Sequence, residues 1–264
     1  MDTASFQELI WEQGRAHYRS MPWREEPTFY NVLISEIMLQ QTQVARVLEK
    51  YRSFKRAFPT IDNLAAAPLS AVLIEWQGLG YNRRAKFLHE AAKQVVTIGI
   101  PRSLQDMQAL PGVGKNTAGA IMNYVYEQPT AYIETNIRTV YFHHFFPGDN
   151  DVGDATLLAV VESTLDREHP REWFYAIMDY GAHLKSKGSA RLSQSKHYKK
   201  QAPLAGSVRE VRGYILASLS AGPVTMHDLS SSRPDFADRF VPALKGLVSD
   251  GLVTEDDDIL KLTD

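Results

Sequence analysis

Cysteine is missing from the whole sequence of 264 residues. Its absence excludes disulfides, thiolate nucleophiles, cysteine-based zinc fingers and cysteine-ligated iron–sulfur clusters. Long apolar runs are also missing, since no stretch approaches the roughly 18 residues that a membrane span needs. The opening residues, MDTASFQELIWEQG, are acidic and polar where a secretory signal would be basic and then apolar. We therefore expect no metal, no cofactor, no membrane association and a cytoplasmic location.

The sequence has no excess of positive charge, with 29 Lys and Arg against 31 Asp and Glu. Its overall charge gives no support to nucleic-acid binding, although a local basic surface can still provide it. Such a surface is indicated between Tyr180 and Val208, where Asp and Glu are absent. We predict a basic loop or linker here, whose cations could contact a nucleic-acid backbone. Its basic residues are Lys185, Lys187, Arg191, Lys196, Lys199 and Lys200.

Apolar residues recur at intervals of three and four through most of the chain, which predicts amphipathic helices. Glycine and proline separate these segments into helices joined by tight turns. Strand-like runs are scarce before the last sixty residues. The predicted helical segments are residues 6–18, 29–58, 69–76, 83–96, 116–126 and 155–165.

The last sixty residues have a different pattern. A helical run is followed by a connection, a second helix and a β-hairpin, which indicates a small winged-helix-like α+β module. We predict three parts: an all-α body at residues 1–184, the basic linker at 185–206, and the module at 207–264. Such a module need not bind DNA, because it can also serve as a packing unit or recruit a partner protein.

Two glycines flank Val113 in the segment LPGVGKNTAGAIM, and a helical run begins directly after them. A turn of this kind points backbone N–H groups outward at a helix N-terminus. It can bind a backbone phosphate without reading the base sequence, because glycine permits close approach. Taken alone, this segment is more typical of a plain turn between helices.

One acidic residue, Glu36, lies in an otherwise apolar helical segment. Its neighbours Val32, Leu33, Ile37 and Leu39 are all apolar. Burial among them would raise the pKa of the carboxyl group, as a general acid near neutral pH requires. The alternative is a glutamate on the solvated face of an amphipathic helix.

Six segments make the sequence resemble the A/G-specific adenine glycosylases, the MutY family of the helix-hairpin-helix DNA glycosylase superfamily. They are MPWR, SEIMLQQTQV, FPTIDNLAAAPL, WQGLGYNRRAKFLHEAA, LPGVGKNTAGAI and IMDYGA, in the family's order and spacing. The resemblance covers residues of about 20 to 185. It implies an all-α, two-lobed helix-hairpin-helix glycosylase fold. It also implies a monofunctional hydrolysis of adenine from mismatches with guanine or oxidised guanine in double-stranded, nucleoid DNA.

The resemblance assigns catalytic and base-binding roles by position. Glu36 falls where the family has its general acid, which would protonate the leaving adenine. Arg24, Asp179 and Asn136 would belong to the base pocket. Glu134 stands where the family normally carries an aspartate, and it is longer by one methylene. We expect it to supply the second carboxylate, which stabilises an oxocarbenium-like transition state while water attacks the sugar.

The resemblance also assigns DNA-binding roles. Gln40, Gln41 and Tyr81 fall where such enzymes insert side chains into the base stack after the nucleotide is flipped out. The expected backbone-binding residues of the hairpin are Gly112, Val113, Gly114, Lys115 and Asn116.

Three familiar features of the superfamily are absent. Bifunctional relatives carry a Schiff-base lysine at the position of Asn116, so we expect base release without efficient strand cleavage. The four cysteines of the iron–sulfur cluster have no counterpart, and KSKGSARLSQSKHYKKQ stands where they would be. The family's domain for 8-oxoguanine is too large for the last sixty residues, so recognition of that base is unsupported.

The adjacent His143 and His144 invite a metal site, but neighbouring helical residues point about 100° apart and no further ligand motif accompanies them. We therefore expect packing there and no metal. Two other functions remain open from the sequence: a thymine or uracil glycosylase acting on G mismatches, and a non-catalytic protein that binds DNA structures. We expect a monomer.

Overall fold

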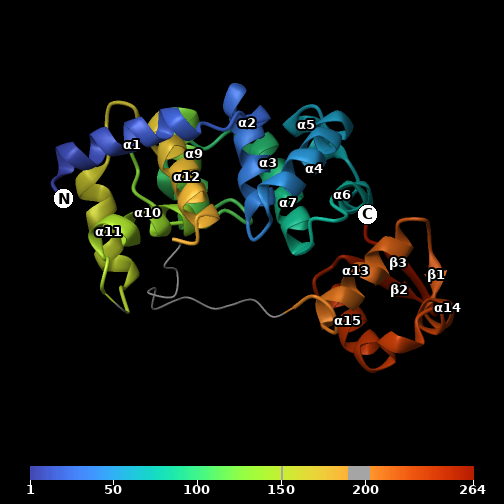
Figure 1. Ribbon diagram of the computed structural model, residues 1–264. Coiled ribbons are helices and arrows are strands. Elements are labelled where there is room, and N and C mark those ends of the chain that lie inside the picture. The colour runs from blue at the N-terminus through green and yellow to red at the C-terminus, as the bar shows by residue number, and fades with distance from the viewer. Residues whose placement is uncertain (150, 190–202) are drawn as a thin grey trace. The chain divides into compact units, whose positions relative to one another are not determined.

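The computed structural model describes residues 1–149, 151–189 and 203–264. Within them the chain is largely helical, and the three strands all lie in the C-terminal part (Figure 1). The predicted fold class, an all-α body followed by a small α+β module, is confirmed. The predicted residues Arg191, Lys196, Lys199 and Lys200 lie outside the described residues.

The chain forms two compact units. The first unit contains the described residues of Met1–Glu36, Pro101–Ala109 and Val113–Lys200. The second contains those of Ile37–Ile100, Leu110–Gly112 and Gln201–Asp264. The C-terminal module therefore belongs to the same compact unit as residues 37–100. The predicted division of the chain at 184 and 207 stays a prediction.

The long helix α12 (Pro170–Ser186) organises the first unit, where it packs against α1 (Thr3–His17), α9 (Lys115–Tyr126) and α10 (Thr135–Phe145) (Figure 1). Its side chains Trp173, Phe174 and Ile177 are fully buried. The remaining helices of this unit are α2 (Pro22–Glu25), most of α3 (Phe29–Leu39), α8 (Leu104–Gln108) and α11 (Asp154–Thr164).

In the second unit, α7 (Arg83–Ile98) packs against two shorter helices, α5 (Ile61–Ala66) and α6 (Leu69–Glu75). Helix α4 (Val44–Ala57) packs on α6 in turn. Leu88, Ala92 and Val95 of α7 recur at the helical spacing and are buried, so the burial follows the sequence pattern.

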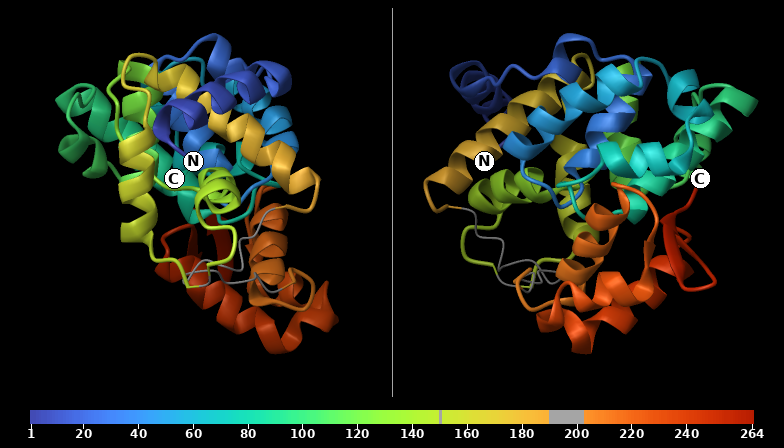
Figure 2. Two further views of the ribbon diagram at one scale, coloured as in Figure 1. Left: turned by 60° about the vertical axis from the view of Figure 1, so that its left-hand side comes forward. Right: turned by 90° about the vertical axis from the view of Figure 1, so that its right-hand side faces the viewer.

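The C-terminal module has the predicted winged-helix-like order (Figure 2, orange to red). Its antiparallel sheet has the order β1-β3-β2, and β2 and β3 form a hairpin. The predicted connection between two helices in fact contains a strand and a helix. The elements are α13 (Val208–Leu219), β1 (Val224–Thr225), α14 (Met226–Ser231), η2 (Pro234–Phe236), α15 (Ala237–Ser249), β2 (Val253–Asp256) and β3 (Ile259–Leu262).

The prediction of one helical segment over residues 29–58 is wrong, because α3 ends at Leu39 and α4 starts at Val44. Neither glycine nor proline lies in between. The guanidinium of Arg84 instead donates to the carbonyl oxygens of Ile37 and Met38, both at 2.9 Å. It thereby satisfies acceptors that a helix leaves unpaired at its C-terminus.

In the described part of the chain, no helix combines the length and apolar character needed to cross a bilayer. The same residues contain no group of three or more His, Cys, Asp or Glu side chains placed to hold a metal ion. His144 packs as expected, with Nε2 3.0 Å from the hydroxyl of Tyr180 and its ring against Phe6. Burial lowers the pKa of His144 to about 4.

Candidate active site

Glu36 lies near the C-terminal end of α3, between the fully buried side chains of Leu33 and Ile37. The residue itself keeps a partly accessible surface. Burial raises the pKa of its carboxyl group to about 8, and the negative charge of Glu134 raises it further while Arg24 opposes the rise. Glu36 is therefore protonated at neutral pH and still reachable, which suits a proton donor.

Glu134 is the N-cap residue of α10. Its Oε1 accepts hydrogen bonds from the backbone N–H groups of Asn136 at 2.5 Å and Ile137 at 2.7 Å. Its Oε2 accepts from the Asn136 side chain at 3.2 Å. Both oxygens are thus held, and the positive end of the helix favours the ionised form.

A lysine also acts on this carboxylate. Burial is the largest effect and leaves the pKa of Glu134 raised, although the charge of Lys185 and the two backbone N–H groups oppose the rise. The Nζ of Lys185 donates to the hydroxyl of Thr135 at 2.8 Å. In the structure the charge of Lys185 favours the ionised form of Glu134, and its contact with the DNA backbone stays a prediction.

Arg24 and Asp179 form a buried ion pair, at 8% and 1% exposure. The Arg24 guanidinium donates to both carboxylate oxygens, at 2.7 and 3.1 Å. Arg19 adds a bond from its Nε at 2.6 Å and one from its backbone N–H at 3.1 Å. Because four donors occupy Asp179, its contribution to a base pocket runs through the placement of Arg24.

Three tyrosines near Glu36 were not identified from the sequence. The hydroxyl groups of Tyr124 and Tyr132 lie 2.7 Å apart, and burial raises both pKa values well above the usual value. The Tyr175 ring lies 4.4 Å from the Arg24 guanidinium carbon and 4.7 Å from the Tyr124 ring. Among the described residues, nothing forms a hydrogen bond with the buried Tyr175 hydroxyl. A tyrosine within an apolar segment is typical of a core residue. The sequence therefore gives no signal that distinguishes these three tyrosines from packing residues.

The first unit thus holds two carboxyl groups in different electrostatic surroundings. Glu36 keeps its proton because it is buried beside a negative charge, whereas Glu134 is surrounded by donors and a lysine. Pairs of carboxyl groups whose environments separate their pKa values are typical of acid-assisted bond cleavage, in which one donates a proton and the other stabilises a cation.

The predicted hairpin lies between α8 and α9. Gly112 has φ +76°, and a Cβ there would stand 2.9 Å from the Cβ of Phe87, so the fold itself requires this glycine. Gly114 has φ −83°, and no atom of the described chain lies within 4 Å of where its Cβ would be. Glycine at 114 is therefore not needed for the fold, and it leaves the N-terminus of α9 open to a ligand.

The other residues of the hairpin differ in their exposure to solvent. Val113 is buried, whereas Lys115 and Asn116 are exposed in the first turn of α9. The side-chain oxygen of Asn116 accepts from the backbone N–H of Ile133 at 3.4 Å. Lys187, at the end of α12, is exposed as well.

Of the three residues predicted to enter the base stack, two are exposed on strained backbone. Gln41 has φ +56° and Tyr81 has φ +47°, a region that residues other than glycine rarely adopt. Gln40 is instead directed toward the hairpin, where its Nε2 donates to the carbonyl oxygen of Gly112 at 3.1 Å.

A single guanidinium organises both loops. Arg84 donates to the carbonyl oxygen of Gln40 at 2.6 Å in one loop and to that of Gly80 at 2.9 Å in the other. Sequence reasoning missed this residue. A signal was present, because Arg84 and the buried Leu88 are four residues apart and share the apolar face of α7.

Comparison with known proteins agrees with this arrangement. The family described as "HhH-GPD superfamily base excision DNA repair protein" matches residues 34–161. The adenine DNA glycosylase of Mycobacterium tuberculosis is 34% identical over 93% of this chain and 88% of its own length. That of Buchnera aphidicola is 35% identical over 62% of this chain, but this chain spans only about half, 48%, of that relative.

Two solved structures share the fold. A thermostable thymine-DNA glycosylase has a TM-score of 0.60 at 24% identity, covering 68% of this chain and 86% of its own. A trapped endonuclease III–DNA covalent intermediate has a TM-score of 0.54 at 18% identity, covering 77% and 91%. The fold and the site define the class as a DNA-binding base excision repair protein. The chain belongs to the adenine DNA glycosylases of the HhH-GPD superfamily.

The iron–sulfur cluster that the family resemblance implies does not fit this chain. Such clusters are held by cysteine thiolates, and the sequence contains none. The chain is a cysteine-free variant of its family.

Proposed function

We propose that this protein is a monofunctional DNA glycosylase that hydrolyses the N-glycosidic bond of an adenine mispaired with guanine or 8-oxoguanine. The observation that carries the proposal is the Glu36 and Glu134 pair in one unit, in which burial and the charge of Glu134 raise the pKa of Glu36 to about 8. Glu36 lies in one of the segments by which the chain resembles the family, and Glu134 stands where the family normally carries an aspartate. We also infer that the protein acts as a monomer in the cytoplasm, on nucleoid DNA.

The reaction begins with proton transfer from Glu36 to a ring nitrogen of the flipped adenine. The bond between the base nitrogen and the sugar then breaks, and its electron pair leaves with the base. Glu134 stabilises the resulting oxocarbenium-like sugar through its negative charge. Water adds to the anomeric carbon, and the proton it releases returns to the Glu36 carboxylate. Every step uses side chains of the chain and water.

Binding of the duplex uses separate residues. Backbone N–H groups at Gly112, Val113 and Gly114 hold a phosphate at the N-terminus of α9, and neighbouring cations add contacts that weaken with salt. Gln41 and Tyr81 enter the base stack and fill the gap left by the flipped nucleotide. Their exposure supports this assignment.

No strand cleavage accompanies base release. A Schiff-base mechanism needs an amine at the position of Asn116, whose amide is not nucleophilic. Borohydride should therefore trap no covalent complex with DNA, and the product should carry an intact abasic site. Trapping of a stoichiometric complex would contradict this part of the proposal.

The test uses purified protein and labelled duplexes with A opposite 8-oxoguanine, A opposite G, T opposite G and U opposite G, followed by alkali. Cleavage confined to the adenine duplexes supports the proposal. Cleavage of the T or U duplexes would show that the substrate is thymine or uracil instead of adenine, with the same hydrolysis of the glycosidic bond. Duplex binding without base release, unchanged in the Glu36→Gln variant, would identify a non-catalytic DNA-binding protein.

A further inference from the structure

An arginine of the C-terminal module contacts Tyr81. Arg209 Nη1 donates to the Tyr81 hydroxyl at 3.2 Å, and its guanidinium carbon lies 5.9 Å from the centre of the ring. The guanidinium carbon of Arg84 lies 5.6 Å from the same centre. Tyr81 therefore interacts with one cation from the first turn of α7 and one from a segment 128 residues later.

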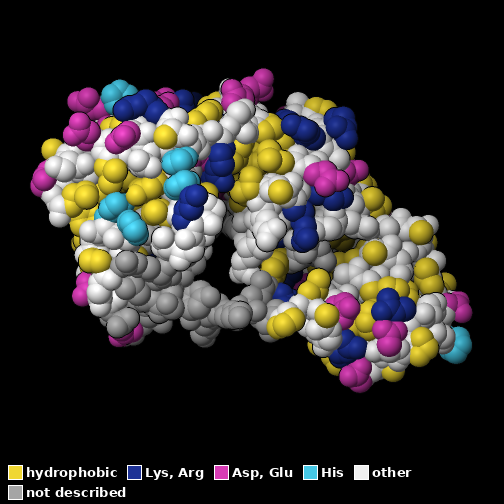
Figure 3. Space-filling model, in the orientation of Figure 1, with side chains coloured by type: hydrophobic (Ala, Val, Ile, Leu, Met, Phe, Trp, Pro, Cys, Tyr) yellow, Lys and Arg dark blue, Asp and Glu magenta, His cyan; other side chains and the backbone are white. Residues whose placement is uncertain are grey.

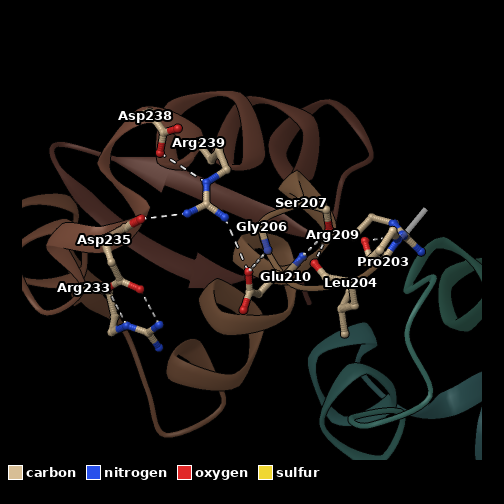
Figure 4. A network of polar contacts seen from close by, with 10 residues as sticks. All are labelled: Pro203, Leu204, Gly206, Ser207, Arg209, Glu210, Arg233, Asp235, Asp238 and Arg239. Carbon is tan, nitrogen blue, oxygen red and sulfur yellow. Dashed lines mark hydrogen bonds and ion pairs between the residues drawn. The ribbon is translucent and has the colours of Figure 1, made fainter.

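The module holds Arg209 in place through its own contacts (Figure 4). Arg209 is the second residue of α13, and its Nη2 donates to the carbonyl oxygen of Pro203 at 3.2 Å. The adjacent Glu210 accepts from the backbone of Gly206 at 2.8 Å and from Arg239 of α15 at 3.4 Å. Hydrogen bonds with Pro203, Gly206 and Arg239 therefore hold the segment that carries Arg209.

The module also contacts α7. Lys86 Nζ donates to the carbonyl oxygen of Asp250 at 2.8 Å. The Asp250 carboxylate pairs with Arg83 of α7 at 3.4 Å and with Arg212 of α13 at 2.5 Å. These bonds tie both long helices of the module to the helix that directly follows Tyr81.

The charge of the module does not suit phosphate binding. Residues 203–264 contain six basic and ten acidic side chains, and the β2–β3 hairpin carries Glu255, Asp256, Asp257 and Asp258 in sequence. On the face shown in Figure 3, magenta and dark blue side chains alternate over the module. An acidic hairpin repels a DNA backbone, so the module's effect on DNA must come through protein contacts.

We propose that the C-terminal module is a positioning unit for Tyr81, in which Arg209 holds the tyrosine exposed and ready to enter the base stack. The inference rests on the proposed function, since it assumes that Tyr81 enters DNA. A residue with positive φ keeps that conformation only when its surroundings hold it. Arg84 binds the loop backbone beneath, and Arg209 binds the side chain. Holding the side chain in advance reduces the ordering that DNA binding requires.

The test measures DNA distortion separately from chemistry. Full-length Glu36→Gln protein is titrated onto an A:G duplex that carries 2-aminopurine beside the guanine, and the fluorescence increase reports unstacking. We expect Arg209→Ala to weaken this association about tenfold, the effect of one charged hydrogen bond. Arg209→Lys should recover part of the loss. Arg233→Ala removes the same charge from the module, at a residue that packs on Phe236, and should change nothing.

A double variant shows whether Arg209 affects DNA association through Tyr81 or by contacting DNA itself. In a Tyr81→Phe background, Arg209→Ala should change the association less than twofold, because the hydrogen bond to the hydroxyl is already lost and only the weaker contact with the ring remains. A full tenfold effect there would mean that Arg209 contacts DNA directly and would overturn the proposal, as would a normal response of Arg209→Ala alone. Failure of the proposed function has a different readout, namely a wild-type protein that releases no adenine from the unmodified duplex.

Discussion

The negative charge of Glu134 raises the pKa of Glu36, so that the two carboxyl groups lose their protons at different pH values. The N-terminus of α10 and Lys185 oppose the effect of burial on Glu134. Among the described residues, the cation that opposes the raised pKa of Glu36 is Arg24. Chemically identical groups thereby acquire opposite tasks from their surroundings.

Replacing Glu36 by Gln should abolish base release and stabilise the fold. The folded pKa of about 8 lies above the ordinary glutamate pKa of 4.5, so the stability that goes with the protonated form is lost as pH rises between these values. At pH 7 the variant should be more stable by at most about 3 kcal/mol. Urea unfolding at pH 4.5 and 7 measures the difference. Equal stability of the two proteins at pH 7 would contradict the burial of this carboxyl.

Removal of Asp179 should destabilise the first unit strongly. Asp179→Ala leaves the buried Arg24 without its partner, which costs about 3–5 kcal/mol. Asp235→Ala is the matched control, because it breaks a pair whose side chains are both exposed, and it should cost less than about 1 kcal/mol. Denaturant unfolding of both variants gives the comparison. Similar losses in the two would show that the Arg24 pair is not a buried one.

Gly181 allows α12 to approach the helix that Glu134 caps. A Cβ at this position would lie 2.6 Å from the carbonyl oxygen of Asn136. Gly181→Ala should therefore displace the start of α10, cost about 1–3 kcal/mol and lower the rate of base release. Gly213→Ala in α13 meets no described atom within 4 Å and should stabilise by about 0.4–1 kcal/mol. Thermal unfolding and single-turnover rates distinguish the two.

Local sequence patterns predicted most helices and the order of the C-terminal module, because burial follows the spacing of apolar residues. They failed between Leu39 and Val44, where the helix ends without a local signal. The carbonyl groups there are satisfied by Arg84, which is more than forty residues away in the sequence. A tertiary hydrogen bond of this kind leaves no trace in the segment that it terminates.

Site residues that the family resemblance assigns were predicted from the sequence, and site residues outside any motif were missed. Glu36 and Glu134 came from the resemblance, and the apolar neighbours of Glu36 indicated its raised pKa. Tyr175 and Arg209 carry no motif, and their contacts depend on packing between elements distant in the chain. The sequence showed that the Glu134 side chain is longer than the family's aspartate, but only the structure showed that it accepts hydrogen bonds from two backbone N–H groups of its own helix.

The central claim is that Glu36 acts as the acid beside an ionised Glu134, and the pH dependence of kcat/KM on an A:G duplex tests it most directly. In the wild-type protein the rate should fall as pH rises through about 8. In Glu134→Gln it should drop about 10²–10³-fold, as when one preorganised electrostatic group is lost. Its alkaline fall should also move to lower pH, because the charge that raises the pKa of Glu36 is gone. A wild-type rate that stays constant to pH 10, or an alkaline fall unmoved by Glu134→Gln, would contradict the account.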